Sequence, residues 1–235
     1  MNDDQKQYWH NVYTDSKNVG TDDYKKNVFR TKKGKPLDEK IWQKTLEYIC
    51  RLVAVDKRSS VIELCCGNGE IIGNLSPKPR EAIGVDYSKQ LLDQMMERFD
   101  GSVKAIYSDA LRAKFSNSSA DIVIIYAGIQ YFSEQDTIRL VKNSLDWLKP
   151  GGRLLLGDVP DELKKWEYIN KPEYRTDYIN RVLNNRPLIG YWYHPEFFKA
   201  LANYFADISV DIIDQPTYQI NASFRYDVLI KKLRV

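Results

Sequence analysis

The sequence predicts an α/β protein with a doubly wound, Rossmann-like sheet of seven mostly parallel strands that ends in an antiparallel C-terminal hairpin. Short apolar runs alternate with amphipathic segments between residues 38 and 160, which is the pattern of strands and crossover helices. Residues 122–125 are entirely apolar, as expected of a central strand covered on both faces. The alternation stops after residue 160, and two later apolar runs predict the hairpin at an edge of the sheet.

The first half of this pattern predicts three strands and three helices. A helix over residues 38–54 begins at an acidic residue, Asp38, and carries apolar residues at spacings of three and four. A glycine turn and a short helix over residues 69–75 follow the first strand, and Ser88 is expected to cap the helix after the second strand. The three strands are predicted at residues 61–64, 82–85 and 103–107.

The second half predicts four strands and two helices. Ser133 and Asp136 bracket the start of a helix that runs to Leu148, where a Lys-Pro-Gly-Gly sequence ends it. A helix over residues 195–204 has a proline in its first turn. The four strands are predicted at residues 121–126, 153–157, 208–213 and 226–233.

The length and composition are those of one domain with a sizeable core. The chain has 235 residues, of which 43% are hydrophobic. We assign residues 38–235 to a single domain. Residues 1–37 are too polar for a core of their own, and we interpret them as a helical lid over the domain or as a partly disordered segment.

Charge, hydropathy and cysteine content give no sign of a nucleic-acid partner, a membrane-spanning helix, a disulfide framework or a zinc site. A formal net charge of +3 gives no electrostatic reason to expect a nucleic acid. No apolar run approaches the roughly 20 residues of a membrane-spanning helix, and the polar N-terminus lacks the apolar core of a signal peptide. Cys50, Cys65 and Cys66 are an odd number of thiols, which indicates reduced cysteines rather than disulfides, and soft ligands are too few for zinc. We therefore expect a cytoplasmic protein with no membrane partner and no metal.

A strand, a glycine turn and a helix follow one another around residues 60–75, the layout that brings backbone N–H groups close to a ligand. Glu63 lies near the end of the strand, and Gly67 and Gly69 form the turn. Asp86 ends the next strand, 17 residues after Gly69, where its carboxylate can accept hydrogen bonds from both hydroxyls of a ribose. A simpler interpretation of Asp86 is a turn or capping residue before Ser88.

The predicted strands end in a row of polar side chains. Because ligands bind beyond the carboxyl ends of parallel strands, these side chains are candidates for one site. They are Glu63, Asp86, Asp109, Tyr126 and Asp158. A nicotinamide cofactor also fits a ribose-binding acid, but the glycine spacing differs from the dinucleotide pattern, and the Glu63 carboxylate would lie close to the pyrophosphate. Glu63 instead suits an adenosine that carries a cationic group.

Five motifs in order resemble the class I S-adenosylmethionine-dependent methyltransferases of the small-molecule type. The motifs are residues 61–69, 84–88, 108–110, 120–123 and 148–154. Two positions depart from the family pattern: Cys65 stands where glycine is common, and Glu63 replaces the more frequent aspartate. The resemblance implies that Asp109 lies near the adenine amino group. A surface role and a contact with the cofactor carboxylate both stay open for Arg30.

The resemblance implies S-adenosylmethionine as the cofactor, with S-adenosylhomocysteine as its product. It assigns the cofactor site to Arg30, Glu63, Cys65, Gly67, Gly69, Asp86, Tyr87, Asp109, Ala110 and Tyr126. It also places residues 161–193 as an insertion on the substrate side, although these aromatic residues suit a homodimer interface or ordinary packing equally well.

The implied function is methyl transfer to an oxygen or nitrogen of a small molecule. The chain lacks the Asn/Asp-Pro-Pro-aromatic motif and the Pro-Cys nucleophile of methyltransferases that act on bases or on glutamine, so a small-molecule acceptor is expected. An oxygen acceptor would also need a base. Candidates are His194, His10, Tyr131 and Asp158, without a choice among them, and a capping role is favoured for His194. The alternatives are a nicotinamide-dependent oxidoreductase and a catalytically silent, cofactor-binding partner subunit.

Overall fold

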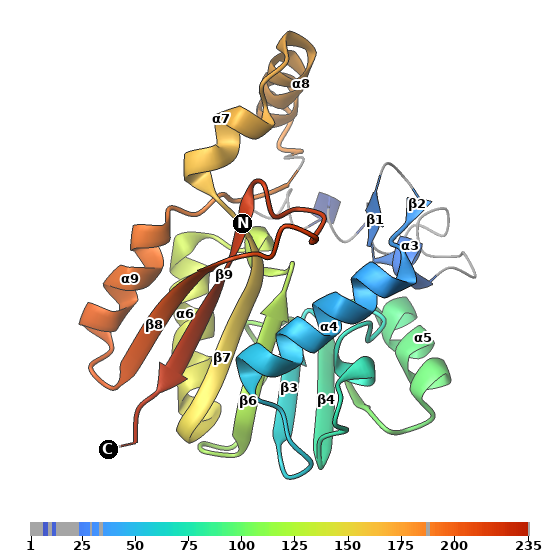
Figure 1. Ribbon diagram of the computed structural model, residues 1–235, viewed down its shortest axis with the longest axis vertical. Helices are drawn as coiled ribbons and strands as arrows, with labels where there is room; N and C mark the ends of the chain where they lie inside the picture. Colours follow the sequence, from blue (N-terminus) through green and yellow to red (C-terminus); the bar gives the residue numbers. More distant parts are fainter. Residues whose placement is uncertain are drawn as a thin grey trace.

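One seven-stranded sheet forms the centre of the molecule, in the order β5-β4-β3-β6-β7-β9-β8 (Figure 1). The computed structural model describes residues 7–8, 11–12, 24–28, 30–32, 35–186 and 189–234. The strands are β3 (Ser60–Leu64), β4 (Glu81–Asp86), β5 (Lys104–Tyr107), β6 (Ala120–Tyr126), β7 (Leu148–Pro160), β8 (Ile208–Asp214) and β9 (Arg225–Lys232). Strands β3 to β7 run parallel, and β9 is antiparallel to both β7 and β8. The predicted fold class is confirmed.

Helices cover both faces of this sheet and form two separate apolar cores. The helices that pack on it are α4 (Glu39–Val53), α5 (Lys89–Phe99), α6 (Glu134–Trp147) and α9 (Pro195–Tyr204). Side chains alternate along each strand, so Val61 and Ile124 join the core beneath α4 and α5, while Ile62 and Ile125 join the core beneath α6 and α9. Glu63 shares the face of Val61 and is therefore directed toward the α4 and α5 side.

The starts of these helices follow the sequence signals. Asp38, Ser88 and Ser133 each accept a hydrogen bond from a backbone N–H of the first turn of the helix that they precede. His194 does the same for α9: its Nδ1 accepts a hydrogen bond from the Glu196 N–H at 3.2 Å. His194 thus caps α9, as the sequence favoured.

The helix expected over residues 69–75 is wrong, because only a 3-10 turn, η1 (Ile72–Asn74), forms there. The Ile72 N–H donates to the buried Glu63 carboxylate at 2.9 Å instead of to a helical carbonyl. The connection between β8 and β9 also differs from the short loop of a tight hairpin, since residues 215–224 separate the two strands. These residues lie beyond the carboxyl end of the sheet, next to the end of β7 (Figure 1).

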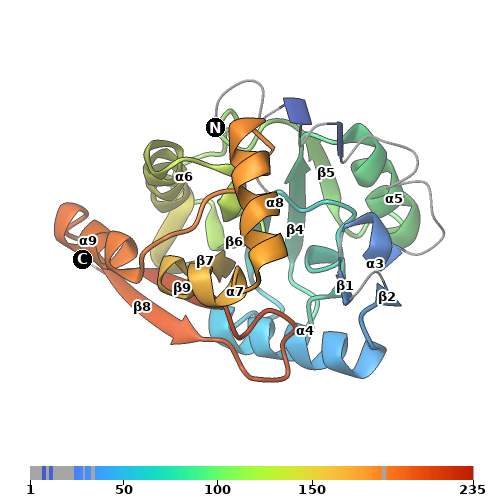
Figure 2. The same cartoon turned by 90° about the horizontal axis from the view of Figure 1, so that it is seen from above.

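Two segments lie beyond the carboxyl ends of the strands (Figures 1 and 2). One comes from the N-terminal part and contains α3 (Tyr24–Asn27) and the paired strands β1 (Thr31–Lys32) and β2 (Lys35–Pro36). The other contains η3 (Glu162–Lys164), α7 (Lys165–Tyr168) and α8 (Pro172–Leu183), and α8 has no buried residue. Within the described residues, no helix combines the length and the apolar character that crossing a membrane requires.

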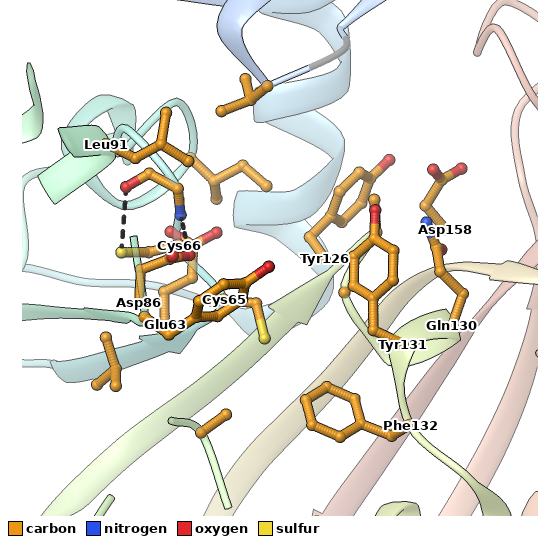
Figure 3. A pocket seen from close by; sticks show the side chains of 18 of the residues that line it. Glu63, Cys65, Cys66, Asp86, Leu91, Tyr126, Gln130, Tyr131, Phe132 and Asp158 are labelled. Carbon is orange, nitrogen blue, oxygen red and sulfur yellow. Dashed lines mark hydrogen bonds between the residues drawn. The ribbon is translucent and has the colours of Figure 1, made fainter. Parts of the chain in front are cut away.

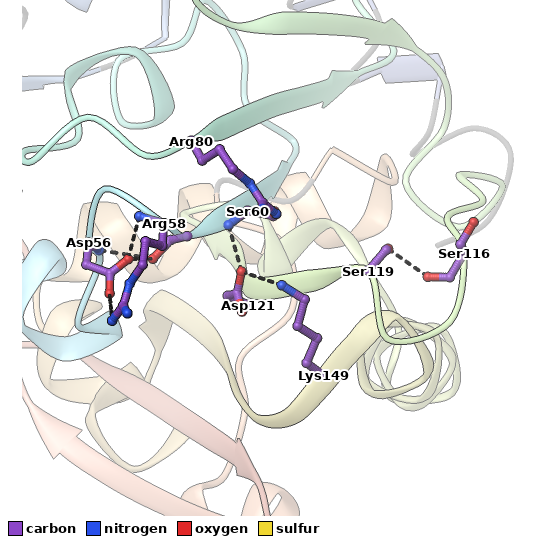
Figure 4. A network of polar contacts seen from close by, with 9 residues as sticks. Asp56, Arg58, Ser60, Arg80, Ser116, Ser119, Asp121 and Lys149 are labelled. Atoms are coloured by element: carbon purple, nitrogen blue, oxygen red, sulfur yellow. Dashed lines mark hydrogen bonds and ion pairs between the residues drawn. The ribbon is translucent and has the colours of Figure 1, made fainter.

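At the opposite end of the sheet, Asp121 ties the beginnings of three strands together (Figure 4). Its Oδ2 accepts a hydrogen bond from the Ser60 N–H, the first residue of β3, and one from the Lys149 Nζ of β7, both at 2.8 Å. The Ser60 hydroxyl in turn accepts a hydrogen bond from Arg80 at 2.7 Å, next to the start of β4. This carboxylate thus fixes where β3 begins relative to β6 and β7.

We expect Asp121→Ala to lower the free energy of unfolding by about 1–2 kcal/mol, because the buried Ser60 N–H loses its acceptor. Asp121→Asn retains an oxygen for Ser60 and loses only a half-exposed ion pair with Lys149, so its cost should stay below about 1 kcal/mol. Urea unfolding followed by circular dichroism measures both changes. Equal losses in the two variants would show that the Ser60 hydrogen bond contributes nothing.

Candidate functional site

A cavity of about 740 Å³ opens at the carboxyl ends of β3, β4, β6 and β7 (Figure 3). This volume lies within the roughly 300–1,000 Å³ of small-molecule sites. Nine of the ten residues predicted for the cofactor site line it: Arg30, Glu63, Cys65, Gly67, Asp86, Tyr87, Asp109, Ala110 and Tyr126. Residues far apart in the sequence are therefore brought to one place, as the strand-end argument predicted.

Gly69 is the tenth residue and does not line the cavity. Its φ is +77°, and a Cβ at this position would lie 2.6 Å from Met95 of α5. Glycine is needed here for the left-handed turn and for helix packing rather than for contact with a ligand. The glycine of this turn that lines the cavity is Gly67, with φ +55°.

Cys65 has a left-handed backbone, with φ +56°, at the position where glycine is common in the resembling family. Its Cβ is accommodated because Gly128 lies opposite: a Cβ on Gly128 would lie 2.9 Å from the Cys65 Cβ. A left-handed conformation costs a residue with a side chain about 1–2 kcal/mol. Burial raises the pKa of the Cys65 thiol well above its usual range, so it is not a reactive thiolate.

Asp86 joins the glycine turn to the helix after β4. One carboxylate oxygen accepts a hydrogen bond from the Gly67 N–H and the other from the Ser88 N–H, each at 2.8 Å. Burial raises the pKa of this carboxyl, and these two hydrogen bonds oppose the increase. Asp86 can hold the turn and also bind a ribose, since a carboxylate has further lone pairs that can accept hydrogen bonds.

Glu63 is the most deeply buried acid of the cavity lining, with 2% of its surface exposed. Burial raises the pKa of its carboxyl to about 8, and the nearby Asp86 and Glu70 add to the increase. The Ile72 N–H and the charge of Arg30 act in the opposite direction. A cationic ligand group beside Glu63 would favour its charged form.

Arg30 reaches the same cavity from the N-terminal segment. Its Nη2 donates to the Tyr126 carbonyl oxygen at 3.5 Å, and its guanidinium lies over the rings of Trp42 and Tyr126. Its Nε is buried and has no hydrogen-bond partner. A buried N–H donor without an acceptor is costly, so this atom is suited to bind an oxygen of a ligand.

Asp109 and Ala110 follow β5 at the far side of the cavity. The Asp109 Oδ1 accepts a hydrogen bond from the Leu111 N–H at 2.8 Å, which holds the carboxylate in the turn after the strand. Tyr87 and Tyr126 supply rings to the lining, and burial raises the pKa of both phenols. Neither phenol is therefore ionised near neutral pH.

The four candidate bases lie in different places. Tyr131 and Asp158 line the cavity, whereas His194 is not among its lining residues and caps α9. His10 lies outside the described residues. Of the described candidates, Tyr131 and Asp158 are thus the two that can approach a ligand.

The sequence interpretation missed several polar residues of the lining, among them Gln130 of η2 (Ile129–Tyr131), Asn221 and Arg225. Arg225 begins β9, which inserts beside β7, so only the sheet order brings it to the cavity. Two charged residues, Arg225 and Asp227, among apolar neighbours in the first half of β9 were the available signal. Among the described residues, no group of three or more His, Cys, Asp or Glu side chains could hold a metal ion.

Residues 61–152 match a family model described as a methyltransferase domain. This part of the chain therefore carries a methyltransferase domain. Curated relatives include the demethylmenaquinone methyltransferase of Lactococcus lactis, which is 28% identical over 152 residues, or 62% of this chain and 55% of the relative. The chondramide synthase cmdD of Chondromyces crocatus is 24% identical over 73% of this chain and 5% of its own length. This chain spans about half the length of the demethylmenaquinone relatives.

Solved structures show the same methyltransferase fold at low sequence identity. Phosphoethanolamine N-methyltransferase 1 of Haemonchus contortus has a TM-score of 0.72 at 14% identity, covering 99% of this chain and 49% of that one. The N-methyltransferase NodS of Bradyrhizobium japonicum has a TM-score of 0.64 at 12% identity, covering 94% of this chain and 98% of that one. Both were solved with S-adenosylhomocysteine.

The buried acid of this methyltransferase domain predicts an unusual dependence of stability on pH. The unfolded chain ionises Glu63 near pH 4.5 and the folded chain near pH 8, so between these values ionisation favours the unfolded chain. We expect the free energy of unfolding to fall, relative to Glu63→Gln, by roughly 1 kcal/mol per pH unit across this interval. The glutamine retains an oxygen for the Ile72 N–H. Parallel stability profiles for the two proteins between pH 5 and 8 would contradict the raised pKa.

Proposed function

We propose that this chain transfers the methyl group of S-adenosylmethionine to an oxygen or nitrogen of a small molecule. The observation that carries the proposal is the convergence of Arg30, Glu63 and Asp86, three residues that the resemblance assigns to the cofactor, in one cavity. S-Adenosylmethionine has a ribose, an ammonium, a carboxylate and a sulfonium. The lining offers a complementary group for each.

The residues of the site fit this cofactor in charge and in hydrogen bonding. Asp86 would accept hydrogen bonds from the ribose hydroxyls, and Glu63 would pair with the ammonium. The partnerless Nε of Arg30 would donate to the carboxylate, which accounts for an otherwise unsatisfied buried atom. Asp109 and Ala110 would lie beside the adenine. The excess of acids over arginines in the lining suits a ligand that carries a sulfonium.

The cofactor supplies an activated methyl group, so the task of the chain is to position the acceptor. Holding two reactants in line converts a bimolecular reaction into an effectively unimolecular one. Glu63, Asp86 and Asp109 lie at or just beyond the carboxyl ends of β3, β4 and β5. This leaves the part of the cavity over β6, β7 and β9 for the acceptor. Tyr126 lies at the boundary between the two parts (Figure 3).

The names of the relatives support a small-molecule acceptor, but they do not identify the acceptor of this chain. The names of several curated relatives refer to demethylmenaquinone, and that of the Haemonchus structure to phosphoethanolamine. We further propose that residues 1–37 and 161–193 cover the acceptor. Gln7, Tyr8 and Val12 line the cavity from the first segment and Ile189 from the second, and Tyr8 interacts with Arg181 of α8. A homodimer through residues 161–193 remains the competing prediction.

We expect S-adenosylhomocysteine to raise the melting temperature of the wild type and to bind Asp86→Asn at least about tenfold more weakly. An asparagine amide cannot accept hydrogen bonds from both ribose hydroxyls while it also holds Gly67. Titration calorimetry measures the affinity, and Asp93→Asn, an exposed acid of α5 paired with Lys89, is the matched control. Unchanged affinity in Asp86→Asn would contradict its role, and a response to NADH in place of S-adenosylhomocysteine would favour an oxidoreductase.

A second variant separates the two ends of the cofactor. Arg30→Met should weaken binding of S-adenosylhomocysteine about tenfold, but it should leave binding of 5′-methylthioadenosine, which has no amino-acid part, within about twofold. Asp86→Asn should weaken both ligands. Arg58→Met, an exposed arginine far from the cavity lining, is the control. Equal loss of both ligands in Arg30→Met would place Arg30 away from the cofactor carboxylate.

A further inference from the structure

The acceptor part of the cavity contains a carboxylate, Asp158, that is held in a strained backbone conformation. Asp158 lies on β7 with φ +59°, in the left-handed region, and has 4% of its surface exposed. For a residue other than glycine, such a conformation persists only where the surrounding structure imposes it, and it is concentrated at functional sites. Asp158 is therefore a candidate functional residue.

A β-bulge sets the direction of Asp158. Leu156 pairs with Val228 and Val159 pairs with Tyr226, so two residues of β7 stand opposite the single residue Asp227 of β9. An extra residue in one strand redirects a side chain that regular pairing would send to the other face. The Asp158 carboxylate thereby reaches the cavity near Gln130, Tyr126 and Tyr131 (Figure 3).

The Asp158 carboxylate is held by long hydrogen bonds. Its oxygens accept from Asn221 at 3.2 and 3.3 Å and from Gln215 at 3.4 Å. Arg225 Nη1 forms an ion pair with the carboxylate at 3.2 Å, while it donates its hydrogen bonds to the Asp158 carbonyl oxygen and to Gln130. The acids at the other strand ends accept shorter backbone hydrogen bonds: 2.8 Å for Asp86 and Asp109, and 2.9 Å for Glu63. N–H···O bonds cluster near 2.9–3.0 Å, so the Asp158 oxygens can still accept a stronger donor. Hydrogen bonds to groups that act on a ligand are often long before the ligand binds.

The charges around Asp158 leave an excess of negative charge. Arg225, 6% exposed, forms an ion pair with Asp158, and a second carboxylate next to Asp158, that of Asp227, is fully buried. The Asp227 Oδ1 accepts the Asp158 N–H at 2.7 Å, and its Oδ2 accepts the Tyr48 hydroxyl at 2.9 Å. Burial raises the pKa of Asp227 to about 6, so near neutral pH the three side chains together carry about one uncompensated negative charge.

Aromatic rings form the wall opposite this charge. Tyr126, Tyr131 and Phe132 line the same part of the cavity (Figure 3). The face of an aromatic ring attracts a cation within about 6 Å. A carboxylate with free accepting capacity and an aromatic wall are together suited to a group that carries N–H donors and a positive charge.

We propose that the methyl acceptor is an amine and that Asp158 binds the nitrogen that is methylated. This inference rests on the proposed methyltransferase function and specifies its substrate class. The bound ammonium first gives one proton to water, which frees the nitrogen lone pair. The lone pair then forms a bond to the methyl carbon, and the methyl–sulfur bond breaks with its electron pair left on sulfur. The new ammonium then loses a proton to water. Asp158 accepts a hydrogen bond from the nitrogen and stabilises the positive charge that develops on it.

Matched pairs of acceptors test the substrate class. Release of S-adenosylhomocysteine from S-adenosylmethionine is measured with ethanolamine and ethylene glycol, glycine and glycolate, benzylamine and benzyl alcohol, and 2-phenylethylamine and 2-phenylethanol. We expect turnover with at least one amine and at least tenfold less with its hydroxyl partner. Turnover of a hydroxyl compound in preference to its amine, or no turnover of any amine by a chain that binds S-adenosylhomocysteine, overturns the inference. Failure to bind S-adenosylhomocysteine overturns the proposed function instead.

Asp158→Asn tests the residue. Asparagine tolerates the left-handed backbone and still accepts a hydrogen bond from Asn221, so the fold should persist. We expect kcat/KM for the amine to fall at least tenfold, through a lower kcat as well as a higher KM, because Asp158 both binds the nitrogen and stabilises the charge that develops on it. The affinity for S-adenosylhomocysteine should stay within twofold. Asp211→Asn, an exposed acid of β8 paired with Lys231, is the matched control and should match the wild type. A kcat/KM within twofold of the wild type in Asp158→Asn, or an equal loss of affinity for S-adenosylhomocysteine, overturns the assignment.

Discussion

The hydrogen bond from the Gly67 N–H to the Asp86 carboxylate is the contact on which the cavity depends. It holds the turn after β3 against the end of β4, and the second oxygen of the same carboxylate holds Ser88 at the start of α5. Because Asp86 is buried, its charge must be balanced by such N–H donors, and it therefore fixes the backbone around it. Glu63 acts in the same way one strand over, through the Ile72 N–H. Acids that can bind a ligand thus also build the turns that surround it.

Much of the fold could be predicted from the sequence because its signals are local. The unbroken apolar run of β6 indicated a central strand, and Ser88 and Ser133 indicated helix starts through their capping side chains. The strand-end rule then brought Glu63, Asp86 and Asp109 together without any knowledge of distances. The family motifs covered the cofactor part for the same reason, since all of them lie on consecutive strands and turns.

The features of the fold and the site that could not be predicted depend on contacts between residues distant in sequence. No local pattern shows that the Ile72 N–H binds a carboxylate, and that contact replaced the expected helix by a 3-10 turn. Nor does a local pattern show that β9 lies between β7 and β8, which brings Arg225 and Asn221 to the acceptor part. The bulge at Asp158 is a property of strand pairing and is invisible in β7 alone. The part of the cavity that we propose for the acceptor was therefore less predictable than the part that we propose for the cofactor.

The close approach of Cys65 and Gly128 has a consequence for how this family can change over time. The space that a side chain occupies at position 65 is the space that is missing at position 128. A sequence with glycine at position 65 has room there for a side chain at position 128, whereas side chains at both positions clash. The two positions should therefore covary across related sequences, with glycine present at one of them whenever the other carries a side chain.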